Sequence, residues 1–232
     1  MCVCRFPLRA RRPVRSSTVE FAAVMNILIV DDHAIVRQGL RQILVESGET
    51  IFIKEADCGS DAIRQVREGE WNVIVLDISL PDRNGIDILK QIKKEYPKIP
   101  VLMLSMHEEG LYAIRALKAG ASGYITKQSA PGELMTAIRQ VARGRKYLTA
   151  TLAEALADSL GADHDQPPHE NLSDREYQTL CLIASGKGLT DAAEEMCLSV
   201  KTVSVYRTRL LEKMKLKNNS ELIHYAIKNG LV

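Results

Sequence analysis

The most constraining feature of the sequence is a series of five short apolar segments, each followed by a longer segment with helical periodicity. The apolar segments are 27–30, 51–53, 72–76, 101–104 and 123–125, and the periodic segments are about 34–47, 60–69, 85–96, 108–119 and 131–143. Strands that are apolar on both faces are typical of parallel sheets covered by helices. The alternation therefore predicts an α/β domain over residues 25–148 with a doubly wound, five-stranded parallel sheet. In such folds the functional site lies at the carboxyl ends of the strands.

The first 24 residues differ in composition from the rest of the chain. They contain five arginines and one acidic residue, without the apolar stretch of a signal peptide. Strand periodicity begins abruptly at Met25. We interpret residues 1–24 as a non-native extension from a start site assigned too early. A disordered basic tail is the alternative, and N-terminal sequencing of the native protein distinguishes the two.

A second, smaller all-α domain is predicted at the other end of the chain. Residues 149–170 form a linker, helical in its first half and then polar with paired prolines. Ser173 and Glu176 have the spacing of a capping box at the start of an apolar helix. Four short helices fit residues 171–232, at about 173–185, 189–196, 200–214 and 219–229. The second and third have the lengths and the short connection of a helix-turn-helix unit.

Positive charge is concentrated on the second helix of that unit. The formal net charge of the chain is only +2. Residues 199–217, however, contain one acidic residue, Glu212, and six basic ones: Lys201, Arg207, Arg209, Lys213, Lys215 and Lys217. A basic helix of this kind attracts the phosphates of double-stranded DNA. On charge alone, the basic solvated face of an ordinary helical bundle is an equal alternative.

Polar residues follow four of the five predicted strands. Asp31 and Asp32 follow the first strand and Asp77 the third, so the three carboxylates should meet at one edge of the sheet. Carboxylates clustered without a cation repel one another, and Mg²⁺, which prefers oxygen ligands, would relieve the repulsion. A carboxylate can also act as a nucleophile and form an aspartyl phosphate. Ser105 and Lys127, after the fourth and fifth strands, could bind a phosphoryl group. Each residue alone would pass for a turn or surface residue, so the inference depends on their joint placement.

These stretches resemble CheY-type receiver domains. The matching segments are 29–33, 75–85, 103–105 and 119–127. The resemblance implies that Asp77 is the phosphoacceptor and that Ser105 and Lys127 contact the phosphoryl group. It also implies that Mg²⁺ is held by Asp31, Asp32, Asp77 and the backbone carbonyl of Ser79, and that Tyr124 reorients with Ser105 on phosphorylation. Many receivers follow the lysine with a cis proline; here Gln128 follows it, which leaves the isomer of that peptide bond open.

The second domain resembles the LuxR-type DNA-binding domain of NarL/FixJ regulators. The matching segments are 172–176, 198–203, 211–214 and 225–232. The resemblance implies that Ser204, Val205 and Thr208 face the bases of DNA. It also implies that Lys201, Thr202, Tyr206 and Arg207 contact phosphates, and that a homodimer reads two half-sites.

The two resemblances together predict a transcription regulator that a sensor histidine kinase switches by phosphorylating Asp77. A phosphorylation-independent DNA-binding regulator, whose receiver serves only for protein contacts, is the alternative. An aspartyl-phosphate phosphatase is a third reading, but the segment 31–34 lacks the second Asp two residues after the first that such enzymes use. We therefore do not predict an enzyme. No apolar segment approaches the roughly 20 residues that span a bilayer, and five scattered cysteines do not suggest a disulfide framework. We expect a cytoplasmic protein that does not enter the membrane.

Overall fold

The computed structural model describes residues 24–106, 111–129, 131–161 and 167–231. The prediction for residues 1–24 therefore lies almost entirely outside the described residues. The five predicted strands form one sheet in the order β2-β1-β3-β4-β5, with every neighbouring pair parallel. Their bounds are β1 Met25–Val30, β2 Ile51–Ala56, β3 Val73–Asp77, β4 Val101–Ser105 and β5 Gly123–Thr126. The predicted doubly wound α/β domain is confirmed.

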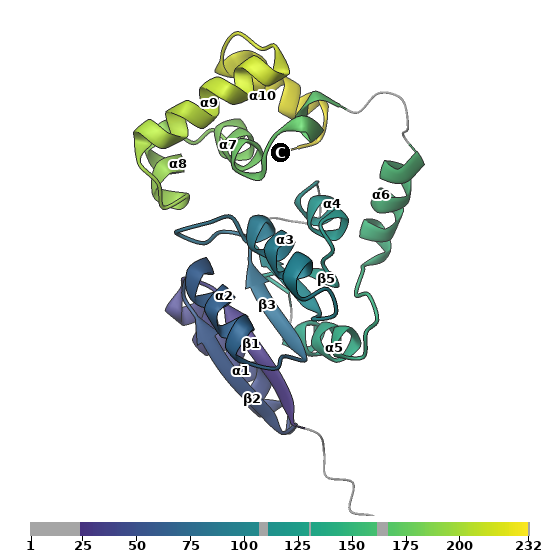
Figure 1. Ribbon diagram of the computed structural model, residues 1–232. Coiled ribbons are helices and arrows are strands. Elements are labelled where there is room, and N and C mark those ends of the chain that lie inside the picture. Colours follow the sequence, from purple (N-terminus) through teal and green to yellow (C-terminus); the bar gives the residue numbers. More distant parts are fainter. Residues whose placement is uncertain (1–23, 107–110, 130, 162–166, 232) are drawn as a thin grey trace, which may run out of the picture.

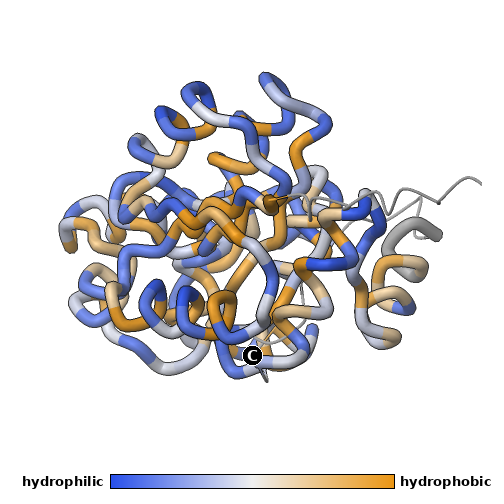
Figure 2. Tube along the Cα trace, turned by 90° about the horizontal axis from the view of Figure 1, so that it is seen from below, coloured by the Kyte–Doolittle hydropathy of each residue, from blue (hydrophilic) through white to orange (hydrophobic). Residues whose placement is uncertain are grey.

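Helices cover both faces of the sheet (Figure 1). Helices α1 (Ala34–Glu46) and α5 (Pro131–Ala142) pack on one face, and α2 (Gly59–Glu68), α3 (Gly85–Glu95) and α4 (Leu111–Lys118) pack on the other. Successive strand residues point to opposite faces, and both sets are apolar here. Ile27 and Ile29 pack under α1 and α5, whereas Leu28 and Val30 belong to the core on the α2–α4 side. Figure 2 shows the hydrophobic segments gathered inside and the hydrophilic turns outside.

A helical linker leads from this domain to the second one. Helix α6 (Ala150–Gly161) contacts α4, and a 3-10 turn, η1 (Pro168–Asn171), leads into the second domain. That domain contains helices α7 (Asp174–Ala184), α8 (Leu189–Glu195), α9 (Val200–Met214) and α10 (Asn219–Lys228). Ser173 and Glu176 form the predicted capping box at the start of α7. The smaller all-α helix-turn-helix domain is thus confirmed as well, and none of the described helices is long and apolar enough to cross a membrane.

Candidate phosphorylation site and DNA-binding surface

The acidic site lies at the carboxyl edge of the sheet, where neighbouring strands end side by side. Asp77 is the last residue of β3, and Asp31 directly follows the adjacent strand β1. Both are buried, with 1% and 0% of their surface exposed. Together with the more exposed Asp32 and His33, they offer ligand atoms that all lie within 4.8 Å of one another. The predicted clustering of the three carboxylates is therefore present.

Lys127 lies among these carboxylates. Its Nζ is 2.7 Å from Asp31 Oδ2 and 2.8 Å from Asp77 Oδ2. Burial raises the pKa of Asp77 to about 6, and the Lys127 ammonium opposes that rise. Burial acts to lower the pKa of Lys127, but the two carboxylates outweigh it and raise the value. Lys127, predicted at this edge as a phosphoryl contact, thus already neutralises some of the charge of the carboxylates. The peptide bond after Lys127 is trans.

The loop after the proposed phosphoacceptor is built by residues that the sequence pattern did not single out. A side chain at Gly85 would place its Cβ 2.0 Å from the carbonyl oxygen of Asp77, so only glycine fits there. Buried Asn84 caps α3 by accepting a hydrogen bond from the Ile86 N–H at 2.8 Å, and it also pairs with Ser79 in an isolated β-bridge. An Asn-Gly pair at a helix start is the signal that could have identified both residues. This packing fixes the path of the chain just beyond Asp77.

Ser105 and Tyr124 lie on the next two strands. Ser105 ends β4 and is 1% exposed, and its partner in the ladder is Thr126, next to Lys127. The ring of Tyr124 on β5 is fully buried in the same core cluster as Tyr112 of α4. The strands therefore bring Ser105 and Lys127 to the edge that carries Asp77. The reorientation of Tyr124 stays a prediction.

The proposed DNA-contacting residues lie on α9, the second helix of the helix-turn-helix unit. Ser199 caps this helix by accepting a hydrogen bond from the Thr202 N–H at 3.1 Å. Of the seven residues, Lys201, Val205 and Thr208 are exposed, and Thr202, Ser204, Tyr206 and Arg207 are half-buried. Arg207 donates from Nε to Asn219 Oδ1 at 2.6 Å. All seven side chains are therefore at least partly accessible, but Arg207 would have to exchange this partner or bind phosphate with its other nitrogens.

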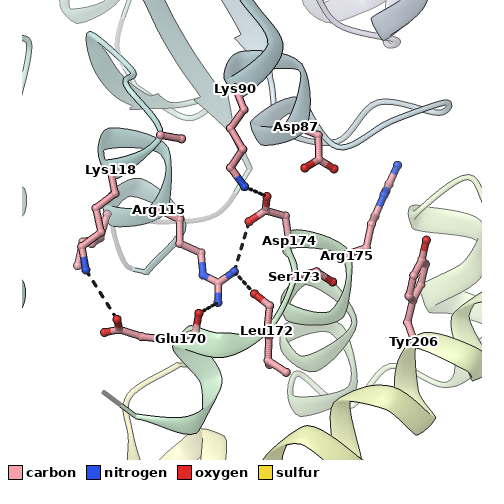
Figure 3. A pocket seen from close by; sticks show the side chains of 12 residues that line it. Asp87, Lys90, Arg115, Lys118, Glu170, Leu172, Ser173, Asp174, Arg175 and Tyr206 are labelled. Atoms are coloured by element: carbon pink, nitrogen blue, oxygen red, sulfur yellow. Dashed lines mark hydrogen bonds and ion pairs between the residues drawn. The ribbon is translucent and has the colours of Figure 1, made fainter. Parts of the chain in front are cut away.

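Helix α7 of the second domain packs against the receiver-like domain, and Arg115 of α4 is the centre of that contact (Figure 3). Its guanidinium donates to the carbonyls of Leu172 at 2.9 Å and His169 at 2.6 Å. It also lies 3.3 Å from Asp174 and stacks 4.3 Å above the ring of Tyr177. Charge-assisted hydrogen bonds of this kind are stronger than those between neutral groups. Arg115 thus holds the start of the second domain on α4.

Further contacts join α7 to the loop beyond Asp77. The side-chain amide of Gln178 donates from Nε2 to Ser79 Oγ at 3.4 Å and accepts at Oε1 from Asn84 Nδ2, also at 3.4 Å. Arg175 donates to the carbonyl of Leu80 at 3.3 Å. Beside them lies an interdomain cavity of about 560 Å³, lined by Lys90, Arg115, Asp174 and, from α9, Tyr206 among others. Helix α7 therefore touches the loop that directly follows Asp77.

We expect His169 to make this arrangement sensitive to acid. It is buried in η1, its Nδ1 is 2.7 Å from the Tyr225 hydroxyl, and its carbonyl accepts from Arg115. Burial lowers the pKa of His169, Arg115 lowers it further, and Glu170 opposes both. The folded state therefore binds fewer protons than the unfolded state near the ordinary histidine pKa of roughly 6.5. Its contribution to stability should be present above that pH and lost as the pH falls below it, through the lower pKa of the folded state.

The measurement is urea denaturation of the wild type and of His169→Gln between pH 5 and pH 8, taking roughly 6.5 as the pKa in the unfolded state. The difference between the two free energies of unfolding isolates this histidine from the other titrating groups. It should grow as the pH rises from 5 to roughly 6.5 and level off at higher pH. A difference that does not change with pH would contradict the expectation.

Comparisons with known proteins agree with both halves of the fold. Residues 27–139 match the family described as "Response regulator receiver domain", and residues 170–226 match "Bacterial regulatory proteins, luxR family". The chain is 34% identical over 209 residues to the response regulator UvrY of Escherichia coli K12, covering 90% of this chain and 96% of that protein. It is 33% identical to the response regulator GacA of Pseudomonas aeruginosa PAO1, covering 90% of this chain and 98% of GacA.

A solved structure shows the same combination of domains. RcsB from Salmonella enterica serovar Typhimurium, bound to promoter rprA in the presence of phosphomimetic BeF3⁻, matches with a TM-score of 0.59 and 26% identity, covering 88% of this chain and 98% of that one. A receiver joined to a LuxR-type helix-turn-helix domain defines a DNA-binding transcription regulator and not an enzyme. The chain belongs to the NarL/FixJ-type response regulators of two-component systems.

Proposed function

We propose that this response regulator is switched by phosphorylation of Asp77. The observation that supports this most directly is the placement of Asp77 at the end of β3, buried, beside Asp31 and in an ion pair with Lys127. A carboxylate oxygen of Asp77 attacks the phosphorus of a phosphohistidine on a sensor histidine kinase. The new P–O bond forms as the P–N bond breaks, and the kinase histidine leaves.

The neighbouring side chains have separate roles in this step. Lys127 exchanges its bond to the Asp77 carboxylate for one to a phosphoryl oxygen while keeping Asp31 as its partner. The Ser105 hydroxyl donates to a second phosphoryl oxygen. Asp31, Asp32, Asp77 and the Ser79 carbonyl are hard oxygen donors, which fit Mg²⁺. When bound, Mg²⁺ would supply positive charge that offsets the charge of the phosphoryl group.

The signal reaches the second domain by two routes in this proposal. The loop beyond Asp77 contacts Gln178 and Arg175 of α7 directly. The core around Tyr124 continues through Tyr112, whose ring lies 4.9 Å from that of Tyr177 in an edge-to-face arrangement. A phosphoryl group on Asp77 adds charge to the loop and shifts both contacts. Helix α7 then separates from the receiver, which frees Tyr206 and lets two second domains pair on DNA.

DNA binding is proposed to occur as a homodimer, with α9 of each copy in the major groove of one half-site. Ser204, Val205 and Thr208 would face the bases, and Lys201, Thr202, Tyr206 and Arg207 the phosphates. The DNA-bound RcsB structures support this reading.

The thiols of Cys58, Cys181 and Cys197 are free, which supports the proposed cytoplasmic location. The test of the whole proposal is whether a phosphodonor raises the DNA affinity of the wild type but not that of Asp77→Asn.

Lys201→Ala should weaken DNA binding to all sequences alike. Lys201 is exposed in the first turn of α9, where an ammonium can contact phosphate without reading a base. We expect the slope of log affinity against log salt concentration to fall by about 1. Fluorescence anisotropy at several salt concentrations measures this, with Lys54→Ala, an exposed lysine on β2, as the matched control. A specific loss at one base pair would instead place Lys201 against the bases.

A further inference from the structure

We propose that the imidazole of His33 is an additional ligand of the receiver's divalent cation. Its nitrogen makes the site favour later transition-metal ions such as Ni²⁺ and Cu²⁺ over Mg²⁺. The inference builds on the cation site proposed above and names its ligand chemistry. The resemblance to receiver domains implies only oxygen donors at this site.

The position of the ring supports this role. His33 Nδ1 lies 2.7 Å from Asp32 Oδ1 and 3.3 Å from Asp31 Oδ1. Adjacent ligands of an octahedral cation with metal–ligand distances of about 2.1 Å are separated by about 3 Å. The two observed separations lie on either side of that value. The nitrogen is therefore already placed as a neighbouring ligand would be.

The two oxygens of Asp31 separate the lysine from the histidine. Lys127 pairs with Oδ2 of Asp31, whereas Oδ1 accepts from the backbone N–H of His33 at 2.8 Å and faces its ring. A cation bound on the Oδ1 side can therefore use Asp31 without displacing Lys127 from it. The backbone hydrogen bond holds His33 next to the site whatever its side chain does.

The ring of His33 contributes little to helix capping or to packing. His33 is the N-cap residue of α1, but its side chain makes no capping hydrogen bond. It is also 63% exposed, so it packs little. The alternative role is a hydrogen bond or ion pair in which Nδ1 donates to the carboxylates of Asp31 and Asp32. Coordination would instead use the lone pair of this nitrogen.

The choice of metal follows from the donor set. Oxygen donors alone suit Mg²⁺, whereas imidazole suits transition metals, whose affinities rise along the series from Mn²⁺ to Cu²⁺. A single nitrogen donor should therefore change affinity for Ni²⁺ much more than affinity for Mg²⁺. His33→Phe keeps a planar ring and removes the nitrogens.

The test uses the full-length protein loaded with Mn²⁺ at pH 7.5 and pulsed electron paramagnetic resonance. The wild type should show a ¹⁴N coupling that changes to ¹⁵N with labelled histidine and disappears in His33→Phe. Asp31→Asn, which should lose most of the bound Mn²⁺, verifies that the metal occupies this site. Calorimetry should show that His33→Phe lowers Ni²⁺ affinity tenfold or more and Mg²⁺ affinity less than threefold.

Three results would overturn the proposal: Mn²⁺ held by Asp31 without a nitrogen coupling, a coupling that persists in His33→Phe, or no Mn²⁺ binding at all. Only the last also removes the cation from the proposed phosphorylation site. Phosphorylation of Asp77 itself is measured separately by mass. A failure of the His33 assignment can therefore be distinguished from a failure of the proposed function.

Discussion

Asp77→Asn is expected to abolish phosphorylation while the protein stays folded. Wild-type protein incubated with acetyl phosphate and a divalent cation should gain one phosphoryl group by intact mass, and the variant none. The amide lacks the nucleophilic oxygen anion, so the P–O bond cannot form. Lys127 keeps its 2.7 Å contact with Asp31 in the variant, so a charged group is not left unpaired in the buried site. DNA affinity should then no longer respond to the phosphodonor.

Asp82→Asn is the matched control for this experiment. Asp82 is in the same loop, but its carboxylate accepts hydrogen bonds from the N–H groups of Gly59 and Ser60 at 2.8 Å each, away from Lys127. This variant should still gain one phosphoryl group. A phosphodonor response in Asp77→Asn equal to that of the wild type would refute the switch. A wild type without an adduct, once rapid self-dephosphorylation had been excluded by a time course, would favour the phosphorylation-independent alternative.

The sequence was sufficient to predict the sheet and the edge that carries the site, because both follow from local periodicity and from the residue that ends each strand. Asp31, Asp77, Ser105 and Lys127 meet because parallel strands end together. The ion pair of Lys127 with both carboxylates could not be predicted, since it depends on the path of a flexible side chain across the strand ends. His33 was missed for a similar reason: a histidine at a helix start is ordinary in sequence, and only its distances to two carboxylates distinguish it.

The interface between the domains could not be predicted from the sequence, for a different reason. Arg115 and its partners are more than 50 residues apart and lie before and after helix α6. On the sequence alone, Arg115 is an unremarkable basic residue in the last turn of an amphipathic helix. Tyr206 was predicted only as a phosphate contact, but it also lines the interdomain cavity. Contacts of this kind depend on how the surfaces of two separately folded domains fit together. Hydrophobic periodicity reports local secondary structure and contains no information about the docking of domains.

Arg115→Ala is expected to open the two domains and raise the DNA affinity of the unphosphorylated protein. The side chain is 13% exposed and bonds two backbone carbonyls and Asp174. Losing these bonds should weaken the closed arrangement by about 2 kcal/mol, which is roughly a 30-fold change in the ratio of closed to open molecules. Small-angle scattering should show a larger radius of gyration. Anisotropy with an operator fragment should show tighter binding and a smaller further gain on phosphorylation.

Lys118→Ala separates this effect from a general loss of positive charge on α4. Lys118 is on the same helix, but its single ion pair, with Glu170, is 3.7 Å long and partly exposed. Ion pairs of this kind contribute little, so the closed form should persist. Equal DNA affinity in wild type and Arg115→Ala, together with an unchanged radius of gyration, would show that Arg115 does not hold the domains together. An enlarged radius with unchanged affinity would show instead that the closed form leaves α9 free to bind. In that case α9 would already be accessible to DNA in the closed protein, and separating α7 from the receiver would not expose it further. Phosphorylation would then have to raise DNA affinity through dimerisation alone.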